Sequence, residues 1–115
     1  MATLMFIEAA TFLVAASIHS GFLLSGHAHR EARIAESVIA GVLMTGAVMA
    51  MRPQWTRRAA LAAQGFALVG TLVGIGTILA GIGPQGRYEL VYHFSIVAVL
   101  AYGIVIAAKQ RRIVF

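Results

Sequence analysis

The sequence contains no cysteine, and this absence excludes several kinds of membrane chemistry. Without thiols the chain cannot hold a disulfide, an iron–sulfur cluster, a thiolate metal site or a thioether-linked haem. A thiol-based quinone reductase is excluded for the same reason. Imidazole and carboxylate groups, which suit iron, copper or zinc, are still present.

Charged residues are also scarce. They make up 11% of the 115 residues, whereas hydrophobic residues make up 60%. So few charges cannot cover the surface of a water-soluble protein of this size. The charges are gathered in clusters, and the apolar runs between them are close to the roughly 20 residues that a membrane-spanning helix needs. The sequence therefore predicts an all-α polytopic membrane protein.

Four membrane-spanning helices are predicted from the positions of the charge clusters. Their predicted ranges are 3–25, 32–51, 58–82 and 88–108. The connections are short, so consecutive helices should run antiparallel in an up-down bundle, with the first and fourth helices in contact. Residues 1–115 form a single domain in this prediction, because almost none of the chain is left for an aqueous domain.

Basic residues are divided unevenly between the two predicted membrane faces. The face that carries both termini has six of the nine lysines and arginines, namely Arg52, Arg57, Arg58, Lys109, Arg111 and Arg112. The other face has Arg30, Arg33 and Arg87. By the positive-inside rule, this bias favours a bacterial-type inner membrane with both termini in the cytoplasm. The basic residues are expected to meet lipid head groups, and no nucleic-acid partner is expected.

Aromatic residues lie close to the predicted helix ends. Trp55 follows Pro53 in the second loop, and Tyr88 and Tyr92 begin the fourth helix. Amphipathic rings prefer the depth of lipid head groups. All three rings are therefore expected to anchor the protein at the membrane surface.

The third predicted helix is rich in glycine, and Gly70 and Gly74 form a G-x-x-x-G pair on one face. Such a pair predicts close packing against another helix. That helix can belong to the same chain, which is the favoured interpretation, or to a second copy or a partner protein. A homo-oligomer, or a subunit of a larger membrane complex, is therefore among the expected assemblies.

Ionisable residues inside the predicted spans are the strongest functional signal, because placing them in lipid is costly. Glu8 and His19 lie eleven residues apart, which is about three helical turns. Their side chains therefore point in directions that differ by only about 20° around the helix axis. Glu36 in the second helix, and Glu89 and His93 in the fourth, are expected at a depth similar to that of His19. Side chains from three helices should therefore converge in the outer half of the membrane.

Two kinds of chemistry fit this cluster. In the first, His19 and His93 are ligands of haem b, or they bind a transition metal ion together with Glu36. In the second, no metal binds and a proton path runs along Glu8, His19, Glu36 and His93, with Gln64 at its cytoplasmic end beside Glu8. Histidine suits this second role because it gains and loses a proton near neutral pH.

A structural role is the third interpretation of the same residues. A buried polar side chain can simply hydrogen-bond a neighbouring helix, which contributes about 1 kcal/mol. Glu8 can extend its carboxylate toward water at the cytoplasmic boundary. In the first loop, His27 and His29 are expected to be solvated, or to form a surface metal site with Glu31.

No enzyme motif is present: the sequence has no G-x-S-x-G, no phosphate-binding glycine loop and no H-E-x-x-H. We therefore predict a small integral membrane protein without an enzyme activity of its own. Its His/Glu site would handle electrons, protons or a metal ion. The alternatives are a non-catalytic accessory subunit and a proton-coupled small-solute transporter that acts as a dimer.

Overall fold

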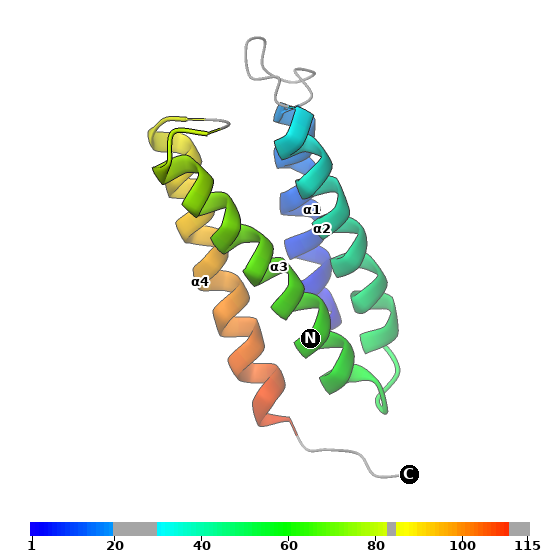
Figure 1. The fold of residues 1–115 in the computed structure, drawn as a ribbon. Helices are drawn as coiled ribbons and strands as arrows, with labels where there is room; N and C mark the ends of the chain where they lie inside the picture. The colour runs from blue at the N-terminus through cyan, green and yellow to red at the C-terminus, as the bar shows by residue number, and fades with distance from the viewer. Residues whose placement is uncertain (20–29, 83–84, 111–115) are drawn as a thin grey trace.

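The structure is a computed structural model that describes the chain except for residues 20–29, 83–84 and 111–115. The described residues form four α-helices and no strand (Figure 1). The helices are α1 (Ala2–His19), α2 (Arg30–Ala50), α3 (Thr56–Leu79) and α4 (Arg87–Lys109). All four are long and apolar enough to cross a membrane. The predicted all-α class and the predicted number of apolar helices are confirmed.

The helix boundaries differ from the predicted ones by a few residues. α2 and α3 begin two residues earlier than predicted, and α4 begins one residue earlier, at Arg87. α3 ends at Leu79, although an apolar run to Ile82 had favoured a longer helix. Gly81 has a φ of 77°, and the amide of Ile82 donates to the Thr77 carbonyl oxygen at 2.8 Å. This glycine-dependent cap stops the helix. The predicted end of the first helix lies outside the described residues.

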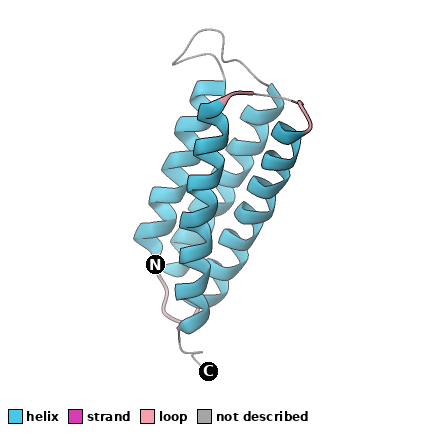
Figure 2. Ribbon diagram, turned by 90° about the vertical axis from the view of Figure 1, so that its left-hand side faces the viewer, coloured by secondary structure: helices cyan, strands magenta, loops and turns pink. Residues whose placement is uncertain are grey.

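Consecutive helices run in opposite directions, and α1 begins at the end of the bundle where α4 finishes (Figures 1 and 2). α1 packs mainly on α2, α2 also packs on α3, and α3 packs on α4. α1 meets α4 over a short stretch only. The expected contact between the first and last helices is therefore local. This arrangement places the end of α1 beside the beginnings of α2 and α4.

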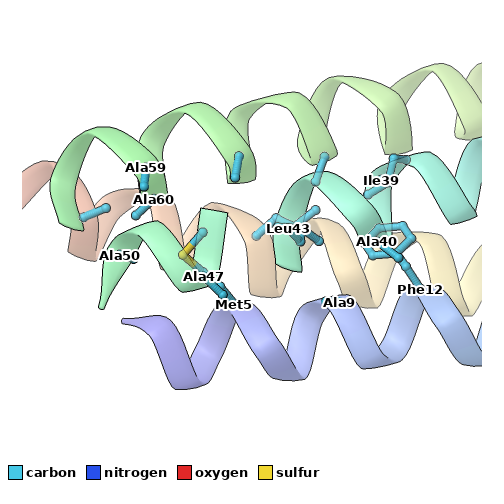
Figure 3. Packing of buried hydrophobic residues seen from close by; sticks show 14 of the residues in the cluster. Met5, Ala9, Phe12, Ile39, Ala40, Leu43, Ala47, Ala50, Ala59 and Ala60 are labelled. Atoms are coloured by element: carbon cyan, nitrogen blue, oxygen red, sulfur yellow. The ribbon is translucent and has the colours of Figure 1, made fainter. Parts of the chain in front are cut away.

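The core consists largely of small side chains from all four helices (Figure 3). Met5, Leu43 and Leu100 are the largest apolar side chains with no exposed surface. The small members of the core include Ala9, Ala40, Ala47, Ala60, Ala63, Ala67 and Ala107. Small residues let helix backbones approach closely, and the resulting van der Waals contacts favour helix association in lipid.

The outward faces carry the large apolar side chains instead. At least half of the surface of each of these side chains is exposed: Ile7, Val14, Val48, Val69, Leu72, Val73 and Val105. Apolar surface of this extent marks a face that meets lipid or another protein. The bundle therefore has small residues inside and large apolar residues outside.

Gly70 and Gly74 face two different helices of the same chain. A Cβ atom at Gly70 would lie 2.9 Å from the Cδ1 atom of Ile39 on α2. A Cβ atom at Gly74 would lie 3.0 Å from the Nε2 atom of His93 on α4. The glycine pair therefore brings α3 close to both of its neighbours within the chain.

Candidate functional site

His19 lies between two glutamates that come from different helices. Its Nδ1 atom is 2.7 Å from the Oε1 atom of Glu36 on α2. Its Nε2 atom is 2.7 Å from the Oε1 atom of Glu89 on α4. The exposed fractions of the three side chains are 3%, 8% and 15% for His19, Glu36 and Glu89. One buried imidazole therefore connects α1, α2 and α4.

The antiparallel fold explains why these three residues meet. His19 is the last residue of α1, Glu36 lies in the second turn of α2, and Glu89 lies in the first turn of α4. These positions are at the same end of the bundle, because α1 runs toward that end and the other two helices begin there. The sequence-based prediction that helices converge at this depth placed His19 near Glu36, and the structure brings the two side chains into contact.

The two short contacts restrict where protons can be. A carboxylate can only accept a hydrogen bond, so each contact needs a proton either on the ring nitrogen or on the carboxyl oxygen. An imidazolium would supply both protons, whereas a neutral imidazole would supply only one. In the neutral case one glutamate must itself be protonated. A proton can therefore be carried by the imidazole or by one of the two glutamates.

Two cavities meet at this cluster. One has a volume of about 230 Å³ and lies among α2, α3 and α4. The other has a volume of about 470 Å³ and lies between α1 and the beginning of α4. His19, Glu89 and Tyr92 line both cavities, whereas Glu36 lines the smaller one only. The imidazole therefore lies between Glu89, which borders both cavities, and Glu36, which borders only the smaller one.

Tyr92 points into the bundle. Its ring packs edge-on against Phe12, with the ring centroids 6.2 Å apart, and against His93 at 5.3 Å. Its hydroxyl group is buried and has no hydrogen-bond partner among the described residues. The predicted role of Tyr92 as a head-group anchor is therefore wrong, because the residue lies on the interior face of α4. Tyr88 is 89% exposed, as an anchor would be.

His93 is connected to the cluster through Glu89. Its Nδ1 atom donates to the backbone carbonyl oxygen of Glu89 at 2.7 Å, one helical turn earlier. Its Nε2 atom lies beside Gly74 and carries the lone pair when the ring is neutral. Both imidazoles line the smaller cavity. Within the described structure their closest connection is through Glu89, whose side chain contacts His19 and whose backbone contacts His93.

The predicted haem or metal ligands, His19, Glu36 and His93, line the same cavity. In the described part of the chain, no group of three or more His, Cys, Asp or Glu side chains is placed to hold a metal ion. His19 has a carboxylate oxygen at each ring nitrogen. A haem iron or metal ion at His19 would have to displace one of them. Cofactor binding by His19, Glu36 and His93 stays a prediction.

Glu8 and Gln64 are fully buried, but neither lines either of these two cavities. Neither carboxyl oxygen of Glu8 has a hydrogen-bond partner in the described residues. The Gln64 side chain donates to the carbonyl oxygen of Ala60 at 3.2 Å and to the sulfur of Met1 at 3.7 Å. Their part in a proton path stays a prediction. His27 and His29, proposed for a loop metal site, lie outside the described residues.

Glu89 is the residue of the site that sequence reasoning did not include among the proton carriers or ligands. Its predicted depth in the membrane is similar to that of His19, but a residue at the start of a helix can equally be solvated. The available signal was its spacing of four residues from His93, which puts both side chains on one helical face. That face is the one that α4 turns toward His19.

No family model, curated protein or solved structure matches the chain. A function must therefore be inferred from the geometry of the side chains.

Proposed function

We propose that this protein is an integral membrane protein that transfers protons through a relay of Glu89, His19 and Glu36. The observation that carries the proposal is the buried imidazole with a carboxylate oxygen 2.7 Å from each ring nitrogen. Histidine exchanges protons at both nitrogens near neutral pH, and carboxylates are suitable donors and acceptors for it. Proton relays are one of the functions that ionisable side chains inside membrane spans mark.

Membrane insertion is supported by the distribution of apolar residues. Each of the four helices has the length and hydropathy of a membrane span. Large apolar side chains cover the outside, while small ones fill the core. The six basic residues on the face with the termini, against three on the other, favour cytoplasmic termini in an inner membrane. The relay then lies near the outer face.

Proton transfer can proceed in two steps at the imidazole. A protonated Glu89 gives its proton to Nε2 of His19, which forms an imidazolium ion. The imidazolium then gives the proton on Nδ1 to the Glu36 carboxylate. One proton has moved from Glu89 to Glu36, and the neutral imidazole is left with its proton on Nε2 instead of Nδ1. A flip of the imidazole ring restores the first tautomer.

The contacts favour this reaction over binding of haem or a metal ion. An axial ligand uses one ring nitrogen with a free lone pair, and only the other nitrogen is held by a second group. In His19 both nitrogens have carboxylate partners. The cluster therefore suits an imidazole that passes protons on, and loss of either glutamate should interrupt it.

The proposal is tested by proton flux into liposomes that contain the purified protein and a trapped pH-sensitive dye. A potassium diffusion potential drives protons inward. We expect wild-type protein to acidify the interior, and Glu36→Gln or Glu89→Gln to slow acidification by at least about tenfold. Arg33→Gln is the control, because it removes an exposed charge from the same end of the bundle. The proposal would be overturned if liposomes with wild-type protein acidified no faster than liposomes without protein. It would also be overturned if both glutamate variants acidified the interior as fast as the wild type.

A further inference from the structure

We propose that a groove between α2 and α3 binds an anionic phospholipid. The groove has a volume of about 430 Å³ and lies at the end of the bundle that carries the α2–α3 turn. Trp55 and Arg58 line it at the turn, and Val42 and Phe66 line it farther along the helices. The inference rests on the proposed membrane location, but it does not depend on the proton relay.

The shape of the groove follows from residue size. Gly46, Ala59 and Ala63 are buried, so the floor is made of small residues. Met49 and Phe66 are exposed and form part of the rim. Apart from Arg58 and the indole N–H, the lining side chains are apolar. Such a channel can take an acyl chain, whose contacts are with hydrocarbon alone.

Arg58 stands at the end of the groove next to Trp55. Its guanidinium carbon lies 6.0 Å from the centroid of the Trp55 ring, which is a cation–π arrangement. Trp55 is 41% exposed, and tryptophan prefers the head-group depth of a membrane. Guanidinium groups bind phosphate oxygens through paired, charge-assisted hydrogen bonds. A phosphate group beside Arg58 would thus lie at the mouth of the acyl-chain groove.

The charge around this mouth is positive. Arg52, Arg57 and Arg58 lie close together in sequence, and none has an ion-pair partner within the ranges that the structure describes. The sequence has no acidic residue between Glu36 and Glu89. The Nε atom of Arg57 is buried and lacks a hydrogen-bond partner in the described residues. An anionic head group would supply the missing negative charge.

The distance along the groove also fits a lipid better than a free anion. Arg58 and Phe66 are eight residues apart on α3, which corresponds to about 12 Å along the helix. A small anion at Arg58 would leave that length of apolar channel without an occupant. A phospholipid would fill both parts, with its phosphate at the turn and one acyl chain along α2 and α3.

The experiment uses Trp55, which is the only tryptophan in the chain. Bromine atoms on a lipid acyl chain quench a nearby indole, so Trp55 fluorescence reports which lipid occupies the groove. The protein is reconstituted in phosphatidylcholine with increasing fractions of either dibrominated phosphatidylglycerol or dibrominated phosphatidylcholine. We expect the anionic lipid to reach half-maximal quenching at a mole fraction about fivefold lower, the effect of one arginine at an anionic surface.

Two pairs of variants separate the head-group contact from the groove. Arg58→Gln should abolish the preference for the anionic lipid, whereas Arg33→Gln at the opposite end should keep it. Ala62→Phe, which fills the groove, should reduce quenching by the anionic lipid to the zwitterionic level. Ala101→Phe on α4 places the same ring at an exposed position outside the groove and should have no effect.

Equal quenching of the wild-type protein by the two lipids would overturn the lipid site, and so would an unchanged preference in Arg58→Gln. Neither result would affect the proton relay, because the readout does not involve proton flux. Absence of quenching by both lipids would instead show that Trp55 does not reach the bilayer. That result would contradict the membrane location on which both proposals depend.

Discussion

The Nδ1 atom of His19 and the Oε1 atom of Glu36 lie 2.7 Å apart, although the two residues belong to different helices and both are almost completely buried. A carboxylate in such a place is costly unless it is paired. The imidazole is therefore required for the stability of the end of the bundle where Glu36 and Glu89 meet. The relay and the fold depend on the same contacts.

Replacing His19 should destabilise the protein strongly. In His19→Ala, Glu36 and Glu89 lose their shared partner, and we expect the free energy of unfolding to fall by about 3–5 kcal/mol. Reversible unfolding in mixed micelles, followed by circular dichroism, measures this loss. The added substitutions Glu36→Gln and Glu89→Gln should recover part of it, because they remove the unpaired carboxyl groups. Equal stability of His19→Ala and wild type would contradict the pairing.

Gly46→Ala should also destabilise the bundle, through packing alone. A Cβ atom at Gly46 would lie 2.5 Å from the Cβ atom of Ala63 and 2.9 Å from the Cε atom of Met5. Helices α2 and α3 would have to separate, at a cost of about 1–3 kcal/mol. Gly41→Ala is the matched control on the same helix, because nothing lies within 4 Å of its added Cβ atom. In thermal unfolding, the Tm of Gly41→Ala should equal or exceed that of the wild type, and the Tm of Gly46→Ala should be lower.

Glu8→Met should stabilise the protein. Glu8 has no exposed surface, and its carboxyl oxygens have no partner among the described residues. Methionine has a similar size and removes the unsatisfied polar atoms, which should raise the free energy of unfolding by about 1–3 kcal/mol. The same unfolding assay measures the change. A loss of stability would mean that Glu8 has a favourable partner in the folded protein.

An absorption spectrum of the purified protein tests the haem interpretation. Because both ring nitrogens of His19 contact carboxylate oxygens, we expect no Soret band in protein purified from its membrane. Elemental analysis of the same sample tests for a bound metal ion. A Soret band that disappears in both His19→Ala and His93→Ala would assign haem to these residues and would replace the relay as the function of the site.

The four helices could be predicted because charge clusters separated by apolar runs set their number and approximate ends. The meeting of His19 and Glu36 could be anticipated as well, because antiparallel helices with short connections put them at one depth. The contact of Glu89 with His19 did not follow from depth alone, since it depends on the rotation of α4 about its axis. Hydropathy does not determine that rotation. It is set by close contacts such as that between Gly74 and His93, in which the absence of a side chain on α3 makes room for the imidazole.

Solid-state NMR of the protein in bilayers, with ¹⁵N-labelled histidine, tests the relay most directly. The His19 signals are identified by their absence from a His19→Gln spectrum. If the imidazole bridges the two carboxylates, Glu36→Gln should shift mainly the Nδ1 resonance and Glu89→Gln mainly the Nε2 resonance. If Glu36→Gln and Glu89→Gln both leave the two His19 resonances at their wild-type positions, His19 contacts neither glutamate. The proposed proton relay would then be wrong.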